Sequence, residues 1–189
     1  MNAFLVSTGV VALGEIGDKT QLLAMMLAAR YHRPALICLG VLIATLANHA
    51  LAGLVGQLAA QLLDPGVLQW VLGISFLLMA GWLLIPDTLD ETPKPMRGLG
   101  VLAATITLFF LAEMGDKTQV ATVALAARYD SLIAVVGGST LGMMLANVPA
   151  VYLGARAAGR LPARLVHGIA AALFAILGGA TLLNAADWA

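Results

Sequence analysis

A seven-residue motif occurs twice in this chain, each time in the middle of a long apolar stretch. Residues 15–21 read Glu-Ile-Gly-Asp-Lys-Thr-Gln, and residues 113–119 repeat them 98 positions later with Met in place of Ile. One Asp, Lys or Arg at the centre of a membrane helix costs roughly 2.5–3.5 kcal/mol on the insertion scale. The motif therefore predicts internal charge pairing, a bound ion, or both.

The composition indicates an integral membrane protein. Of 189 residues, 61% are hydrophobic and only 11% are charged, whereas soluble domains carry about 25% charged residues. The formal net charge is zero, so no basic surface points to nucleic acid. Cys38 is the one cysteine in the sequence, which excludes a disulfide framework and a cysteine-rich metal site within one chain.

Six membrane-spanning segments can be placed. A bilayer requires about 20 apolar residues per crossing, and prolines together with a charged stretch near the middle of the chain separate the apolar segments. Neither flank of a motif is long enough to cross alone, so each motif must lie inside a span. The predicted spans are residues 4–29, 35 to the 54–60 region, 67–85, 99–127, 132–155 and 165–185.

The repeat extends beyond the motif. Ala-Ala-Arg-Tyr at 28–31 recurs at 126–129, and Phe76 and Gly81 recur as Phe174 and Gly179. We predict two three-helix repeats, residues 1–88 and 99–189, joined by a cytoplasmic linker at 89–98 into one domain. Because three crossings are an odd number, the second copy enters from the opposite face. The expected fold is an all-α membrane protein of six transmembrane helices with inverted-topology repeats.

Basic residues are concentrated on one predicted side of the membrane. By the positive-inside rule this side is cytoplasmic, so both termini are expected outside. His32 and His167 fall in the predicted cytoplasmic loops, where we expect them to be solvated. The cytoplasmic side carries Arg30, Arg33, Lys94, Arg97, Arg156, Arg160 and Arg164, and the opposite side carries Arg128.

The acids of the motif are predicted to form one site. On a continuous helix, Glu15 and Asp18 share a face, and Glu113 and Asp116 do the same. A two-fold relation between the repeats would bring both faces together at the membrane midplane.

The motif lysines follow their glutamates at a spacing that favours ion pairs. Lys19 is four residues after Glu15, and Lys117 is four residues after Glu113, which is the favourable order on one helix. Four carboxylates and two ammonium groups would carry a net charge of −2. One divalent cation neutralises that charge, although protonated carboxylates would also balance it.

The donor types favour a hard divalent cation. Carboxylate, hydroxyl, amide and backbone carbonyl oxygens suit Ca²⁺, Mn²⁺ or Mg²⁺ rather than Zn²⁺ or Cu⁺. Gly14, Gly17 and Gly115 flank the acids and would permit either a helix break that exposes carbonyls or close approach of another helix. The predicted ligands are Glu15, Asp18, Glu113, Asp116, Thr20, Thr118, Gln21 and Gln119.

Three further polar residues lie in the predicted second and fifth spans. Asn48 and Asn147 either extend the ligand set as a second shell or form an interhelical hydrogen bond. His49 has no counterpart in the second half and is expected to be packed or hydrogen-bonded rather than a ligand. No HExxH, GxSxG, P-loop or GxGxxG motif is present, so the sequence offers no basis for an enzyme.

The doubled motif resembles that of a known family of membrane cation exchangers. The pattern E-x-G-D-[KR]-[ST], present twice in a six-span protein, is similar to that of Golgi calcium/manganese transporters, chloroplast manganese transporters and bacterial manganese exporters of the MneA type. The resemblance covers nearly the whole chain. The compact length of the chain is most similar to that of the bacterial members. It implies that Glu15, Asp18, Glu113 and Asp116 line the cation site and that Mn²⁺ or Ca²⁺ moves against protons.

The combined interpretation is a secondary transporter in the bacterial inner membrane that exports Mn²⁺, with Ca²⁺ as the second candidate, in exchange for protons. Metal, protons and the lipid bilayer are its expected partners, without a permanent cofactor; a homo-oligomer is compatible with the sequence. Lys19 and Lys117 are expected to hold the acids ionised and to pair with them when metal leaves. A passive cation channel and a membrane assembly protein are the alternatives.

Overall fold

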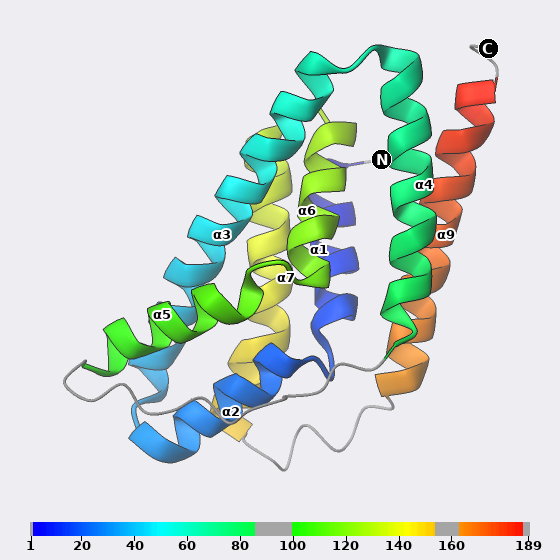
Figure 1. Cartoon of the computed structure of the whole chain (residues 1–189). Coiled ribbons are helices and arrows are strands. Elements are labelled where there is room, and N and C mark those ends of the chain that lie inside the picture. Colours follow the sequence, from blue (N-terminus) through cyan, green and yellow to red (C-terminus); the bar gives the residue numbers. More distant parts are fainter. Residues whose placement is uncertain (1, 86–99, 154–162, 187–189) are drawn as a thin grey trace.

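The computed structural model describes residues 2–85, 100–153 and 163–186, and this part of the chain is entirely helical (Figure 1). The predicted linker at 89–98 and the basic residues Lys94, Arg97, Arg156 and Arg160 lie outside it. The helices are α1 (Ala3–Glu15), α2 (Lys19–Tyr31), α3 (Pro34–Leu62), α4 (Pro65–Leu83), α5 (Val101–Glu113), α6 (Lys117–Arg128), α7 (Leu132–Leu153) and α9 (Ala163–Ala186).

Four helices are long and apolar enough to cross a membrane: α3, α4, α7 and α9. Their bounds agree with those of four predicted spans to within a few residues. Pro34 and Pro65 each stand in the first turn of a helix, where the missing N–H costs nothing. Large apolar side chains such as Leu78 and Ile176 are mostly exposed on these helices, which suits a surface in contact with lipid rather than water.

The other two predicted spans are not continuous helices, so the helix break that the motif glycines would permit is the alternative that the structure has. The segment 4–29 is divided into α1 and α2, and the segment 99–127 is divided into α5 and α6. Each break lies inside the motif, at Gly17 with φ of 86° and at Gly115 with φ of 73°. Both glycines have left-handed backbone, which an L side chain adopts only at a cost of about 1–2 kcal/mol.

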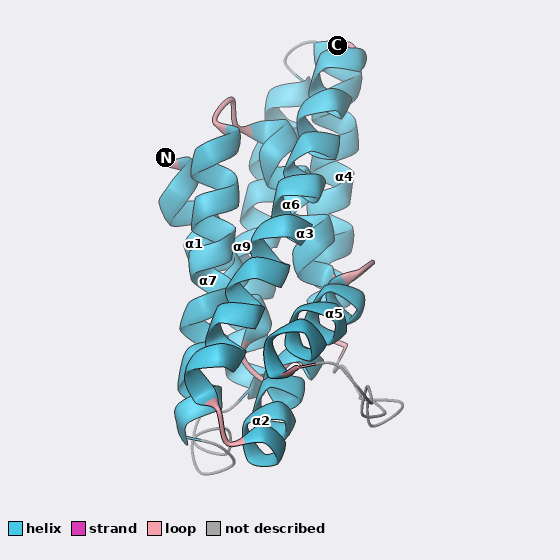
Figure 2. Ribbon diagram, turned by 90° about the vertical axis from the view of Figure 1, so that its left-hand side faces the viewer, coloured by secondary structure: helices cyan, strands magenta, loops and turns pink. Residues whose placement is uncertain are grey.

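The acids beside the breaks are buried, whereas Gly17 and Gly115 themselves are exposed, and the two repeats pack across each other. Here α1 packs along α7, and α3 packs along α5 and α6, while α4 packs along α9. Figures 1 and 2 show α2 and α5 running obliquely at one end of the molecule, with the other helices more nearly parallel. Small residues allow the closest approaches: a side chain at Gly138 would collide with the backbone of Phe4, and one at Gly56 with the backbone of Val123.

Candidate functional site

Each motif forms the same turn between two helices. Glu15 is the last residue of α1, and Asp18 is the N-cap of α2; Glu113 and Asp116 occupy the equivalent places between α5 and α6. The expectation that Glu15 and Asp18 share the face of one helix is therefore wrong. The C-terminal ends of α1 and α5 approach the site, and a helix C-terminus carries partial negative charge that favours a cation.

The motif glutamines brace these turns. The backbone N–H of Gly17 donates to Gln21 Oε1 at 3.0 Å, and that of Gly115 donates to Gln119 Oε1 at 2.7 Å. The side-chain amide of Gln21 donates in turn to the carbonyl of Ala146 at 3.0 Å. Each glutamine thus accepts a hydrogen bond from the glycine of its own turn, and Gln21 also links its turn to α7. The role of the two glutamines as metal ligands stays a prediction.

The motif threonines orient the glutamates. Thr20 Oγ1 donates to Glu15 Oε2 at 2.6 Å, and Thr118 Oγ1 donates to Glu113 Oε2 at 3.1 Å. In each glutamate the other carboxylate oxygen, Oε1, is buried without a hydrogen-bond partner. The hydroxyl therefore fixes one oxygen of each carboxylate and leaves the second available to a ligand.

Three motif acids from the two repeats converge on one point. Glu15, Glu113 and Asp116 each offer one carboxylate oxygen, and these oxygens all lie within 4.8 Å of one another. Both glutamates are fully buried and Asp116 is 3% exposed, and Asp116 Oδ2 also lacks a hydrogen-bond partner. Buried carboxylate oxygens without partners are costly unless a cation or a proton occupies the space between them. Asp18 is equally buried, at 2% exposed, but does not belong to this group of three.

Lys19 pairs across the repeats instead of within its own helix. Its Nζ lies 3.0 Å from Asp116 Oδ1, whereas the sequence predicted an ion pair with Glu15. That prediction is wrong because the helix is broken between the two residues. Lys117 donates to the carbonyl of Ile85 at 2.7 Å, just beyond α4. A motif lysine of one repeat thus neutralises a motif acid of the other.

The two asparagines differ in their contacts. Asn48 on α3 accepts a hydrogen bond from Gln119, which is the interhelical bond that the sequence left as one of two alternatives. Asn147 on α7 donates to the Met143 carbonyl at 3.1 Å, and its Oδ1 atom is buried without a partner. Asn48 therefore contacts the glutamine of the second turn, and Asn147 follows Ala146, whose carbonyl accepts from the glutamine of the first turn.

Of the three histidines, one contradicts its prediction. His32 is exposed, as expected. His167 was expected to be solvated, but it lies on α9, only 9% exposed, and its Nε2 donates to the Ile16 carbonyl at 2.7 Å. No sequence signal connects two residues so far apart. His49 is fully buried, as predicted for a packed residue, but neither ring nitrogen has a hydrogen-bond partner among the described residues.

Comparisons with known proteins match nearly the whole chain. The model of the family described as "Divalent cation/proton antiporter GDT1" matches residues 3–91 and again residues 101–189. A Vibrio cholerae protein named "Putative manganese exporter" is 49% identical over 96% of this chain and 90% of its own length. A GDT1-like protein of Synechocystis is 30% identical over 94% of this chain and 96% of its own length. No solved structure matches the chain.

Proposed function

The chain belongs to the GDT1 family of divalent cation/proton antiporters, and we propose that Mn²⁺ is the cation it exports and that the buried acids of the two motifs bind it. Mn²⁺ is favoured because the Vibrio cholerae relative is named as a manganese exporter and is 49% identical. Ca²⁺ is the second candidate, since the donors are hard oxygens that bind both ions.

The observation that carries the proposal is the convergence of Glu15, Glu113 and Asp116. One carboxylate oxygen of each lies within 4.8 Å of the others, and each carboxylate has a buried oxygen without a hydrogen-bond partner among the described residues. With Lys19 as the neighbouring cation, the ionised group has a net charge of −2, which one divalent ion neutralises. Asp18, Thr20 and Thr118 are the next candidates to complete the coordination. All of these candidate ligands are oxygen atoms, as a hard divalent cation prefers.

Proton exchange follows from the cost of emptying this site. Once the metal leaves, buried carboxylates without a counter-ion must take up protons or stay expensively charged. Metal entry must then expel these protons, because a protonated carboxyl group is a poor ligand. Lys19 supports Asp116 in the empty state through their 3.0 Å ion pair. If the empty, unprotonated carrier reorients poorly, metal and proton fluxes become an exchange.

For the membrane arrangement we propose six crossings, with α1–α2 and α5–α6 as two broken spans. An α-helix rises about 1.5 Å per residue, so the 13 residues of α1 reach about 20 Å, short of the roughly 30 Å hydrocarbon core. Crossing requires the second helix of each pair. The double family match at 3–91 and 101–189 supports two repeats, and the contact between the equivalent rings of Phe76 and Phe174 supports a two-fold axis between α4 and α9.

The orientation is tested by cysteine labelling. We propose a bacterial inner-membrane protein with both termini outside. In a Cys38→Ser background, Asn2→Cys and Pro93→Cys should react with an impermeant thiol reagent from opposite sides of the membrane. Labelling of Asn2→Cys from the cytoplasmic side alone would reverse the orientation.

The ion site is tested by Glu15→Gln and Glu113→Gln, measured as Mn²⁺ uptake into proteoliposomes. Each variant removes one charge and one ligand oxygen from the group while keeping the shape of the side chain, so each should abolish transport and still insert. Transport near the wild-type level in either variant would remove the carboxylate site from consideration. A membrane assembly protein would lose complex formation, not ion flux, in these variants.

A further inference from the structure

The two repeats are packed differently, although their sequences correspond. Residues of α1 and α6, such as Val10 and Leu125, share one hydrophobic core with Phe76 of α4 and Phe174 of α9. The equivalent face of α2 packs with α3 and α5 in a second core, which contains no described residue of α4 or α9. The α4–α9 pair therefore covers α1 and α6 and leaves α2 and α5 uncovered.

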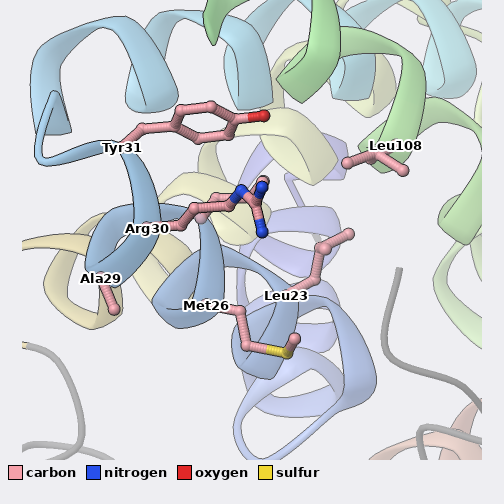
Figure 3. A pocket seen from close by; sticks show the side chains of 7 residues that line it. Leu23, Met26, Ala29, Arg30, Tyr31 and Leu108 are labelled. Atoms are coloured by element: carbon pink, nitrogen blue, oxygen red, sulfur yellow. The ribbon is translucent and has the colours of Figure 1, made fainter. Parts of the chain in front are cut away.

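A cavity lies where the cover is missing. It has a volume of about 370 Å³ and is lined by α2 residues, including Leu23 and Met26, and by Leu108 of α5. Figure 3 shows the Arg30 side chain extending between Tyr31 and Leu23 into this space. Met26 is 37% exposed there. The cavity follows α2, whose first turn carries Lys19 and Thr20 of the ion site.

The apolar part of this cavity has a filled counterpart in the other repeat, although a separate cavity of about 300 Å³ lies beside Ala127 and Arg128, the equivalents of Ala29 and Arg30. Residues 98 positions away from its lining, namely Ala121, Ala124 and Val10, are buried in the core beneath α4 and α9. Ala124 is 5% exposed, against 37% for its counterpart Met26. Equivalent faces of the two repeats are thus open on one side of the molecule and closed on the other.

Close backbone contacts divide the helices into two bodies. Gly73 and Gly178 bring α4 and α9 together, since a side chain at Gly178 would meet the Gly73 carbonyl at 3.0 Å. Similar glycine contacts join α3 to α5 and α6, and α1 to α7. The nearest approach of this kind between the two bodies, from Gly14 to Leu83, is at an ordinary 3.7 Å. The interface between the bodies consists mainly of side chains, which slide more readily than interlocked backbones.

Within the described chain, the α4–α9 pair is tied to the other helices by hydrogen bonds at three places: His167 of α9 donates to the Ile16 carbonyl, the Ile85 carbonyl just beyond α4 accepts from Lys117, and Thr181 accepts from Arg128. Arg128 donates to Thr181 Oγ1 at 2.8 Å, on the covered side. The counterpart of Arg128 is Arg30, which extends into the cavity, and the position equivalent to Thr181 is Leu83, which cannot accept a hydrogen bond. The Arg128–Thr181 bond therefore has no equivalent that would hold the opposite arrangement.

We propose that α4 and α9 move together as the gate of the transporter, and that the Arg128–Thr181 hydrogen bond is the latch that holds this gate closed over α1 and α6. The inference rests on the proposed transport function. In the alternative state the pair covers α2 and α5, closes the cavity beside Met26 and uncovers the face that contains Ala124. The ion site stays with the other helices, so the metal is exposed to alternate sides without leaving its ligands.

The latch is tested by thiol labelling of the full-length protein in open membrane sheets, in which the reagent reaches both faces. Met26→Cys and Ala124→Cys, each in a Cys38→Ser background, report the two faces through their reaction rates with an impermeant maleimide. We expect Met26→Cys to react at least tenfold faster than Ala124→Cys. Adding Thr181→Val, which removes the acceptor and keeps the shape, should accelerate Ala124→Cys about tenfold and slow Met26→Cys. Thr107→Val, which removes a hydroxyl bonded to its own helix, should change neither rate.

Reciprocal change is the result that supports a moving gate. If both labelling rates rise in Thr181→Val, the bundle has loosened in general. If neither rate changes, the Arg128–Thr181 hydrogen bond does not hold the gate. Either result overturns the proposal. If Ala124→Cys fails to insert, Ala121→Cys reports the same face. The labelling needs no transported ion, so a loss of Mn²⁺ uptake with intact reciprocal labelling would count against the proposed function and not against the gate.

Discussion

Replacing Thr20 by Val should weaken Mn²⁺ binding without removing a charge. The Thr20 hydroxyl donates to Glu15 Oε2 at 2.6 Å. Hydrogen bonds to charged groups contribute about 1.5–3 kcal/mol, and loss of a group that orients a metal ligand typically lowers affinity about 10–100-fold. We therefore expect the Kd for Mn²⁺ to rise by about 10–100-fold in Thr20→Val.

The assay is Mn²⁺ titration of the purified protein, with free Mn²⁺ followed by electron paramagnetic resonance. Thr20→Ser keeps the hydroxyl and should restore affinity, whereas Thr107→Val should leave it unchanged, because that hydroxyl is exposed and bonded to its own helix. Thr118→Val should have the smaller effect, since its bond to Glu113 is longer at 3.1 Å. An unchanged Kd in Thr20→Val, with thermal stability preserved, would refute the view that Thr20 orients Glu15 for the metal.

Two further predictions concern the counter-ion and the turn. Lys19→Met removes the cation that lies 3.0 Å from Asp116. Because its Coulomb repulsion of the metal is lost, the affinity for Mn²⁺ should rise at least tenfold in titrations, and uptake should slow because the metal is released later. An unchanged Kd for Mn²⁺ would contradict this. Gly115→Ala should lower the thermal unfolding midpoint, because φ of 73° costs an L residue about 1–2 kcal/mol. A Cβ added at Gly115 meets no atom within 4 Å, and the same holds at Gly81 inside α4. Gly81→Ala is therefore the control and should be neutral or stabilising. Equal unfolding midpoints for the two variants would argue against backbone strain at Gly115.

The long helices and the chemistry of the site could be predicted from the sequence. Apolar length and proline positions suffice to locate α3, α4, α7 and α9, because a chain in lipid must satisfy its backbone hydrogen bonds within each helix. Phe76 and Phe174, which the repeat identifies as equivalent, are in ring contact at 5.9 Å, a contact that their equivalence alone did not predict. Glu15 and Glu113 converge as the two-fold relation implied.

The helix breaks and their consequences could not be predicted. Gly17 and Gly115 permitted a break, but a glycine costs only about 1 kcal/mol inside a helix, so composition alone could not decide. Once the helix is broken, spacing within the motif no longer defines neighbours, and Lys19 meets Asp116 rather than Glu15. The contact of His167 with the Ile16 carbonyl joins residues 151 positions apart, a separation at which helical periodicity carries no information.

Exchange of a divalent metal for protons at the buried carboxylates can be measured in inside-out vesicles or proteoliposomes with an acidic lumen. We expect Mn²⁺ to accumulate against its gradient, a pH-sensitive dye to report lumenal alkalinisation when Mn²⁺ is added, and an ionophore that collapses the pH gradient to stop the uptake. Glu113→Gln should abolish both the metal and the proton signals. Mn²⁺ equilibration that ignores the pH gradient, with no proton signal, would contradict the account and favour a passive channel.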